Sequence, residues 1–240
     1  MNPQQTQQTQ GTQRTMISVV IPARNEKDGI ELTIRAIPKG ELEKMGFAVQ
    51  ILVVDNDSND GTGELARKAG ADVVFEPRLG YGSAYKAGFA HAKGDIIATA
   101  DADATYPVED IPRLVKILEE ENLDFLTTNR FALMDKDAMS SRNKLGNAIL
   151  SLTMRLFFRL DIKDSQSGMW VFRRTILGKL RLTSNTPLSQ ELKIEACHFA
   201  KCRWKEIPIR YQPRAGEAKL GGWKVGTTNL LHLFQKRIRR

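Results

Sequence analysis

The sequence of 240 residues has only two cysteines and no long apolar run. Its two cysteines, Cys197 and Cys202, cannot make the disulfide framework of a small secreted domain, and the start has no basic-then-apolar signal peptide. The most apolar stretch, 148–160, is interrupted by serine, threonine and two arginines, whereas a membrane-spanning helix needs ~20 apolar residues in a row. These absences predict a cytoplasmic protein that does not cross a membrane.

Positive charge is concentrated at the C-terminal end. The net charge is +8, which is compatible with nucleic acid, an anionic membrane surface or a phosphorylated substrate. Residues 201–240 hold eleven Lys and Arg against two acids, so the rest of the chain is close to neutral. The basic character therefore belongs to the last segment and not to the whole protein.

Short β-branched runs alternate with helix-length segments from residue 16 onward. Strands are expected at 17–21, 50–54, 72–75 and 95–99, and helices at 27–37, 63–68, 81–93 and 111–121. This alternation predicts an α/β fold with a mostly parallel sheet and helices on both faces. Residues 1–15, rich in Gln and Thr, are expected to be a disordered leader.

The alternation weakens after residue 128. The remainder is expected to contain helices at 142–160, 188–200 and 227–240 and strands at 169–172 and 205–210. We divide the chain into a catalytic domain at 16–226 and a basic amphipathic C-terminal helix at 227–240.

Polar residues follow three of the predicted strands. Asp101 and Asp103 come directly after the fourth strand, and the one-residue spacing lets both carboxylates point to the same side. Such a pair suits Mg²⁺ or Mn²⁺, which normally completes its shell with phosphate oxygens of a substrate. A lone Asp-x-Asp is more often a solvated turn, but acids and amides also follow the first and second strands, at Glu26, Asp55 and Asp57. The edge of the sheet is therefore predicted to bind a metal and a diphosphate.

Several motifs resemble the family 2 inverting glycosyltransferases of the GT-A fold. The segment 53–62, Val-Val-Asp-Asn-Asp-Ser-Asn-Asp-Gly-Thr, resembles their nucleotide-binding segment, 18–26 their first strand and donor loop, and 101–107 their Asp-x-Asp metal motif. Within the family, the chain resembles dolichol-phosphate mannose synthases and their archaeal relatives. This likeness rests on the segments 78–86, 164–168, 171–174, 206–209 and 214–220.

The resemblance implies roles for individual residues. Asp101 and Asp103 would bind the metal; some relatives have a further ligand, Gln, where this chain has Thr105. The nucleotide sugar would be bound by Pro22, Arg24, Glu26, Asp55, Asp57, Lys86 and Ala102. The lipid phosphate would be bound by Arg130, Arg142, Arg214 and Lys219, of which Arg130 and Arg142 are also counted as catalytic.

The resemblance implies transfer of a hexose to a polyprenyl (dolichyl-type) phosphate with inversion, and GDP-mannose as the donor. UDP-glucose and UDP-N-acetylglucosamine are alternative donors, because the strand-end motifs do not identify the base or sugar. A sugar nucleotidyltransferase would carry a Gly-rich loop after the first strand, where this chain has Pro-Ala-Arg-Asn-Glu at 22–26. A nucleic-acid binder would leave the acidic strand ends unexplained, so no nucleic-acid partner is expected.

The C-terminal helices predict attachment to the cytoplasmic face of an anionic membrane. Along 143–160, Asn147, Ser151, Arg155 and Arg159 recur every fourth place and form one polar stripe in an otherwise apolar helix. Such a helix is equally expected inside a core. The final helix combines leucines and Phe234 with four basic residues, the composition of interfacial helices.

Overall fold

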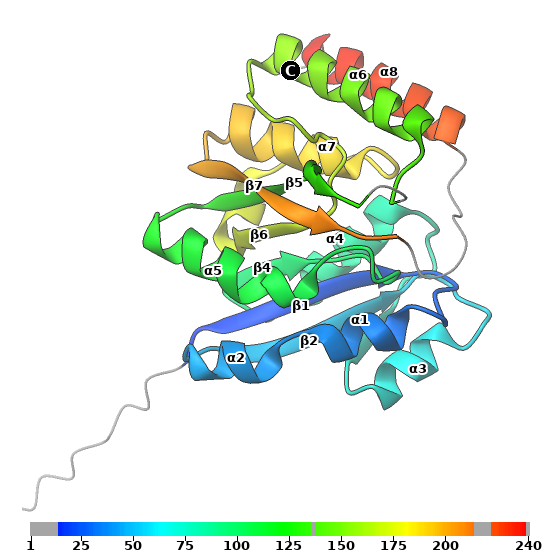
Figure 1. Ribbon diagram of the computed structural model, residues 1–240, viewed down its shortest axis with the longest axis vertical. Coiled ribbons are helices and arrows are strands. Elements are labelled where there is room, and N and C mark those ends of the chain that lie inside the picture. The colour runs from blue at the N-terminus through cyan, green and yellow to red at the C-terminus, as the bar shows by residue number, and fades with distance from the viewer. Residues whose placement is uncertain (1–13, 136–137, 214–221, 239–240) are drawn as a thin grey trace, which may run out of the picture.

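The computed structural model describes residues 14–135, 138–213 and 222–238. In these residues seven strands form one sheet in the order β3-β2-β1-β4-β6-β5-β7 (Figure 1). The strands are β1 (Met16–Ala23), β2 (Ala48–Asp55), β3 (Asp72–Phe75), β4 (Ile96–Thr99), β5 (Phe125–Met134), β6 (Trp170–Arg173) and β7 (Trp204–Tyr211). The helices are α1 (Ile30–Ala36), α2 (Lys39–Lys44), α3 (Thr62–Lys68), α4 (Tyr81–His91), α5 (Ile111–Glu120), α6 (Ser141–Phe158), α7 (Leu188–Lys193) and α8 (Gly222–Ile238).

Strand direction brings the functional ends of the sheet together. β1 runs parallel to β2 and β4, and β2 runs parallel to β3. β6 is antiparallel to both β4 and β5, and β7 is parallel to β5. The carboxyl ends of β1, β2, β4, β5 and β7 therefore share one edge of the sheet, where ligands bind in open α/β folds.

The sheet separates two hydrophobic cores. Side chains alternate along β1, so Ile17, Val19 and Ile21 face one side and Val20 faces the other. The first core is covered by α1, α2, α3 and α5, and the second by α4 and α7, with α6 and α8 packed outside them (Figure 1). The prediction of a mostly parallel sheet with helices on both faces is confirmed.

Some predicted boundaries were wrong. The helix expected at 27–37 starts only at Ile30 and ends before Pro38, since the residue before a proline avoids helical geometry, and α2 follows as a separate helix. The helix expected at 188–200 consists of α7 and a π-helical turn at Ile194–Phe199. The last helix, expected at 227–240, begins at Gly222. The expected leader lies outside the described residues, except for 14 and 15.

The final helix is attached through buried charges. Lys236 Nζ lies 2.8 Å from Glu191 and 2.7 Å from Glu195, and both carboxylate side chains are fully buried. His232 Nε2 is hydrogen-bonded to Ser184 Oγ at 2.8 Å. The backbone carbonyl of Asn229 accepts a hydrogen bond from Gln190. These contacts join α8 to α7 and to the segment that precedes it.

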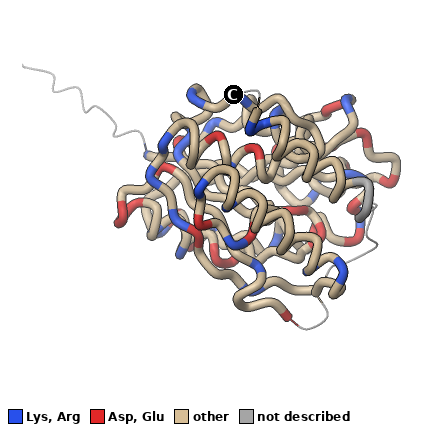
Figure 2. Tube along the Cα trace, turned by 90° about the horizontal axis from the view of Figure 1, so that it is seen from above, with Lys and Arg blue, Asp and Glu red and all other residues tan. Residues whose placement is uncertain are grey.

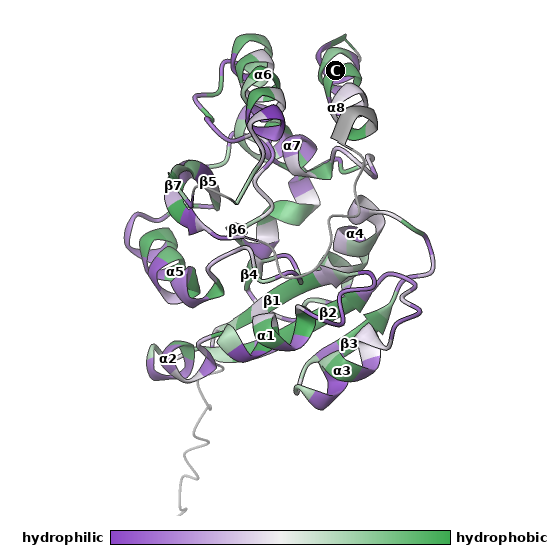
Figure 3. Ribbon diagram, turned by 45° about the vertical axis from the view of Figure 1, so that its right-hand side comes forward, coloured by the Kyte–Doolittle hydropathy of each residue, from purple (hydrophilic) through white to green (hydrophobic). Residues whose placement is uncertain are grey.

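The outer face of α6 differs from its predicted polar stripe. Ser151, expected in that stripe, is 1% exposed and donates to Ser165 Oγ, so this part of the stripe faces inward. Arg155 and Arg159 of the stripe are exposed, and so are large apolar side chains: Leu145, Ile149, Leu152 and Leu156 on α6, and Leu231, Phe234 and Ile238 on the neighbouring α8. Figure 3 shows these two helices side by side at one end of the molecule, and Phe157 packs on Phe234 between them. Within the described residues, no helix is long and apolar enough to cross a bilayer.

Candidate active site

Hydrogen bonds tie the loops after β1 and β2 to each other. The Asn25 amide donates to Ser58 Oγ at 3.0 Å, and the Glu26 amide donates to Thr62 Oγ1 at 2.8 Å. Asp55, at the end of β2, accepts from the Ser58 amide at 3.0 Å. The structure thus brings five predicted nucleotide-binding residues to one edge: Pro22, Arg24, Glu26, Asp55 and Asp57.

Two glycines allow close contacts at this edge. A Cβ atom at Gly63 would overlap the carboxylate of Asp55. A Cβ atom at Gly29 would lie 2.5 Å from the carbonyl oxygen of Ala102 and 2.9 Å from Asp103 Cα. The Asp101–Asp103 turn therefore packs directly against the backbone of the loop after β1, with the buried Ala102 at its centre.

Left-handed backbone conformations occur in each of the three strand-end loops. Asn25, Asp57 and Ala104 have φ values of 54°, 59° and 58°. Alanine adopts this conformation at a cost of ~1–3 kcal/mol, and such strain is concentrated at functional sites. Here it brings the amide and hydroxyl of Thr105 to Asp103 Oδ1, at 3.1 and 2.7 Å. Thr105, which stands where some relatives have a Gln ligand, thus orients a carboxylate.

The carboxylate oxygens of Asp101 and Asp103 are ligands that suit a hard divalent cation bound together with a diphosphate. The described residues contain no group of three or more His, Cys, Asp or Glu side chains suited to a metal. If a Mg²⁺ or Mn²⁺ ion were bound here, Asp101 and Asp103 would be its protein ligands, and phosphate oxygens and water would complete its shell. Burial and the nearby charge of Asp101 raise the pKa of Tyr85 well above its usual value, so this tyrosine stays protonated beside the acidic pair.

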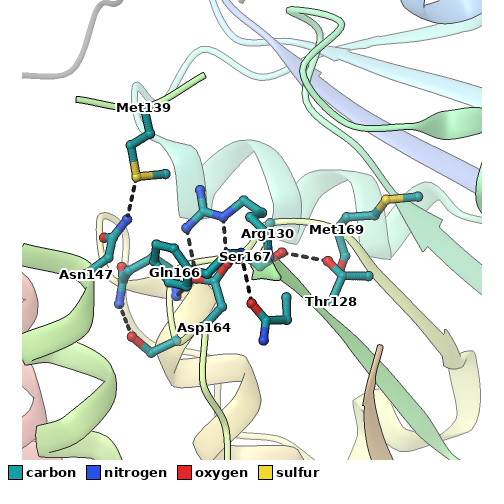
Figure 4. A network of polar contacts seen from close by, with 12 residues as sticks. Thr128, Arg130, Met139, Asn147, Asp164, Gln166, Ser167 and Met169 are labelled. Atoms are coloured by element: carbon teal, nitrogen blue, oxygen red, sulfur yellow. Dashed lines mark hydrogen bonds and ion pairs between the residues drawn. The ribbon is translucent and has the colours of Figure 1, made fainter. Parts of the chain in front are cut away.

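A buried ion pair lies beside the acidic turn. Arg130 on β5 is 7% exposed, and its Nε and Nη2 donate to the two carboxylate oxygens of Asp164 at 2.7 and 2.9 Å (Figure 4). Nη1 takes no part in this bidentate pair. Burial alone would raise the pKa of Asp164, but the charge of Arg130 outweighs it and lowers that pKa. The guanidinium also lies over the ring of Tyr211, 5.2 Å from its centroid.

Tyr106 connects this pair with the acidic turn. It follows Asp103 in the chain and is buried, and its hydroxyl accepts a hydrogen bond from the Gly168 amide at 2.7 Å. Burial raises its pKa well above the usual value, while Arg130 acts to lower it and Asp101 to raise it. A Cβ atom at Gly168 would lie 3.5 Å from both the Tyr106 hydroxyl and Asp101 Oδ1, so the end of the loop that contains Asp164 adjoins the acidic turn.

The loop at residues 163–168, which contains Asp164, is fixed from two sides. Glu206 on β7 accepts hydrogen bonds from the first two amides of the loop at 3.0 Å. Lys193, fully buried at the end of α7, donates from Nζ to the carbonyl oxygens of Asp164 and Ser167 at 2.8 and 2.9 Å. The loop is therefore a rigid support for Arg130.

The other predicted site residues are placed differently. Arg142 is exposed in the first turn of α6, whereas Arg130 is buried, so the two arginines assigned to the lipid phosphate lie in unlike environments. Lys86 on α4 donates from Nζ to the carbonyl oxygen of Ser184 at 3.0 Å, and its charge acts on Glu76, which follows β3. Arg214 and Lys219 lie outside the described residues.

Comparison with known proteins identifies the family. Residues 18–181 match the model of glycosyl transferase family 2, which is more than half of the chain. The chain belongs to glycosyl transferase family 2. This assignment agrees with the resemblance drawn from the strand-end motifs.

The family relatives include lipid-phosphate sugar transferases. A dolichyl-phosphate hexose transferase of Haloferax volcanii is 28% identical over 227 residues, 93% of this chain and 96% of that protein. The low-salt glycan biosynthesis hexosyltransferase Agl6 of the same organism is 33% identical over 87% of this chain, which spans 51% of it. An undecaprenyl-phosphate 4-deoxy-4-formamido-L-arabinose transferase of Edwardsiella ictaluri is 32% identical over 87% of this chain and 64% of its own length.

Solved structures confirm the GT-A fold. Glucosyl-3-phosphoglycerate synthase from Mycobacterium tuberculosis, crystallised with Mn²⁺, UDP and phosphoglyceric acid, superposes with a TM-score of 0.74. It is 21% identical and the match covers 93% of this chain and 79% of that one. At this identity the family 2 chain shares the fold, and the likeness says nothing about its substrates.

Two contributors to the site were missed at the level of sequence. Tyr106 was noted only as part of the motif after the fourth strand, although it lies between the two charged groups. Lys193 was not singled out. The signal for it was a lysine among apolar residues of a buried helical segment, next to Leu192 and Ile194.

Proposed function

We propose that this family 2 chain transfers a hexosyl group from a nucleoside-diphosphate sugar to a polyprenyl phosphate of the dolichyl type, with inversion. The observation that carries the proposal is the buried pair of Arg130 and Asp164 beside the Asp101–Asp103 turn. The named lipid-phosphate transferases among its relatives support the same acceptor class.

The state of Asp164 favours an acceptor that needs no general base. A sugar hydroxyl must lose its proton as it attacks, which requires an available carboxylate. Asp164 is fully buried, accepts both side-chain hydrogen bonds of Arg130 and also accepts from the Arg130 amide. A phosphate monoester is mostly dianionic near pH 7 and can attack without losing a proton. The site therefore offers an N–H of the Arg130 guanidinium to an anion, and the Asp164 carboxylate is not arranged as a base.

The residues suggest how the reaction proceeds. In this proposal the loops after β1 and β2 hold the nucleoside. Asp101 and Asp103 would hold a divalent cation, which when bound would neutralise charge on the departing diphosphate. Arg130 orients the acceptor phosphate through Nη1, the guanidinium nitrogen that makes no hydrogen bond to Asp164. The phosphate oxygen attacks the anomeric carbon in line, and the bond from that carbon to the nucleoside diphosphate breaks on the opposite face.

A matched pair of acceptors tests the proposal. The protein is incubated with Mn²⁺, a nucleotide sugar and either geranyl phosphate or geraniol, and the lipid product is analysed by mass spectrometry. A hexosyl phosphate lipid of inverted anomeric configuration is expected from geranyl phosphate alone. Equal transfer to geraniol, or no transfer to the phosphate from any nucleotide sugar, contradicts the proposal.

For the donor, we propose GDP-mannose, with UDP-glucose and UDP-N-acetylglucosamine as the alternatives. The support is the resemblance of the motifs to dolichol-phosphate mannose synthases. Thermal shifts with GDP and with UDP, each with and without Mn²⁺, separate these donors, because only the correct base adds stabilisation that depends on the metal. Stabilisation by UDP alone overturns the choice of GDP-mannose, and stabilisation by duplex DNA alone overturns the enzyme assignment.

We also propose that the face formed by α6 and α8 rests on the cytoplasmic surface of an anionic membrane, where the acceptor lipid resides. Seven large apolar side chains on these helices are exposed, among them Leu156 at 70% and Ile238 at 81%. The two helices contain six Lys and Arg and no Asp or Glu. Figure 2, seen from the end at which α6 and α8 lie, shows Lys and Arg among the residues there. Apolar burial and ~1 kcal/mol per basic residue near anionic lipid would hold the protein in place.

Vesicle flotation tests this orientation. The wild type should float with anionic vesicles at low salt and less at high salt, since salt screens charge. Leu156→Ser should weaken flotation, whereas Leu32→Ser should not. Leu32 is a suitable control because it is 57% exposed on α1, on the other side of the sheet (Figure 1). Equal flotation of both variants, or equal recovery with neutral vesicles, contradicts the proposed face.

A further inference from the structure

A fully buried lysine lies behind Arg130 and has no role in the reaction as described. Lys193 ends α7 and is 0% exposed. Its Nζ contacts two carbonyl oxygens of the 163–168 loop, those of Asp164 and Ser167, at 2.8 and 2.9 Å. Neither contact is with a carboxylate, although a buried ammonium is strongly destabilising when no negative charge compensates it.

The charges that face Lys193 come from several elements. Burial lowers its pKa to about 7; Asp164 in the loop, Glu206 on β7 and Cys197 in the π-helical turn act to raise it, and Arg130 on β5 acts to lower it. The pKa of Glu206 is itself raised by burial, and that of Cys197 is well above its usual value for the same reason. Lys193 is therefore poised between its two protonation states near neutral pH.

The charge of Asp164 is already taken up by Arg130. The carboxylate accepts Nε, Nη2 and the backbone amide of Arg130, at 2.7, 2.9 and 3.0 Å. When Lys193 is protonated, it adds a positive charge that faces the already paired Asp164 and the carboxylate of Glu206, which makes its own hydrogen bonds to the amides of Lys163 and Asp164. An anion held by Arg130 Nη1 would compensate that charge, because interactions between charges are strong where water is excluded.

We propose that Lys193 is a positioning residue for the acceptor phosphate: it clamps the 163–168 loop that orients Arg130, and it supplies positive charge behind the guanidinium when the phosphate is bound. The inference rests on the proposed polyprenyl-phosphate acceptor. By linkage, phosphate binding draws a proton onto Lys193, and protonation of Lys193 strengthens phosphate binding.

Calorimetry on the wild-type protein tests the proton linkage without any substitution. Geranyl phosphate is titrated at pH 8 into protein that holds GDP or UDP with Mn²⁺, in two buffers of different ionisation enthalpy. The second pKa of a phosphate monoester is about 6, so the probe is already dianionic and has no proton to release. Uptake of more than about 0.3 proton per site is expected, since Lys193 is mostly neutral at this pH before binding. No uptake, or proton release, overturns the proposal.

A substitution at Lys193 tests the positioning role. In Lys193→Met we expect the KM for geranyl phosphate to rise about tenfold, the KM for the nucleotide sugar to stay within twofold, and the proton uptake to vanish. Lys205→Met is the control, because Lys205 is an exposed lysine paired at the surface with Glu121 at 2.6 Å. A purely structural role of Lys193 would lower the melting temperature and leave the acceptor KM and proton uptake unchanged, which would overturn the proposal.

The outcomes distinguish this inference from the function on which it rests. If the wild type neither binds geranyl phosphate nor transfers sugar to it, the proposed acceptor is wrong and the role of Lys193 is refuted with it. If the wild type transfers sugar and Lys193→Met does so with the same acceptor KM, only the role of Lys193 is refuted.

Discussion

Removal of the Asp164 carboxylate should destabilise the protein strongly. The carboxylate accepts four hydrogen bonds, three from Arg130 and one from the Gln166 amide, and both charged side chains are buried. Asp164→Ala leaves the Arg130 guanidinium buried without its counter-charge, a change of ~3–5 kcal/mol. A domain of this size loses ~2–4 °C of melting temperature per kcal/mol, so the expected decrease is about 6–20 °C. Thermal and urea unfolding of the variant measure this effect.

A second aspartate provides the matched control for that experiment. Asp124 makes a similar bidentate pair with Arg203, but their side chains are 25% and 52% exposed. Asp124→Ala should therefore reduce stability by only ~0.2–1 kcal/mol. In addition, Arg130→Met combined with Asp164→Leu should be more stable than Asp164→Ala, because it leaves no buried charge unpaired. An Asp164→Ala protein that melts within a degree or two of Asp124→Ala would refute the reasoning from burial.

Four further changes test other parts of the site. Asp103→Ala should abolish turnover and also lower the melting temperature, because the buried carboxylate accepts two hydrogen bonds from Thr105; near-normal activity at limiting Mn²⁺ would contradict the metal assignment. Gly29→Ala should weaken Mn²⁺-dependent binding of the nucleotide in a thermal shift, because its Cβ meets the Ala102 carbonyl, whereas Gly40→Ala, with open space around it, should not. Arg142→Ala should raise the KM for the lipid phosphate more than that for the nucleotide sugar; equal effects on both count against an acceptor role. Burial would raise the pKa of Glu191, but its bonds to His232 and Lys236 lower it overall, so its stabilising contribution should be complete above about pH 5 and decline in acid; Glu191→Gln should flatten that decline in urea unfolding, and an unchanged pH profile would exclude this carboxylate as its source.

The meeting of the loops after β1, β2 and β4 could be predicted because it depends on local patterns. A buried strand has a two-residue period and a recognisable end, so the residues after β1, β2 and β4 could be assigned to one edge before any contact was known. The bonds from Asn25 to Ser58 and from Glu26 to Thr62 are the contacts that this assignment implies. The positive φ of Ala104 was not predictable, because nothing about an alanine indicates it.

The acceptor side depends on contacts between distant residues. Asp164 lies in the segment 164–168 that resembles the family, but its ion pair with Arg130 joins positions 34 residues apart, and no local pattern specifies such a pair. The inward direction of Ser151 on α6 was also hidden. A stripe that repeats every fourth residue gives the relative positions of polar and apolar side chains on a helix, and not which face meets the protein.

The way in which α8 is attached limits how this protein can be shortened. Lys236 lies between the fully buried carboxylates of Glu191 and Glu195, and removal of the helix would leave both without their cation. In a chain that ends before residue 222, Glu191 on α7 and Glu195 in the following π-helical turn would lose the ammonium group that pairs with them. The helix α7 also carries Lys193. Truncation would then disturb the catalytic centre and the outer apolar face together, and a loss of lipid binding in such a protein would have two causes. Single substitutions on the outer side of the helix, such as at Phe234 or Ile238, would change the face that we propose to contact lipid while the charged attachment stays intact.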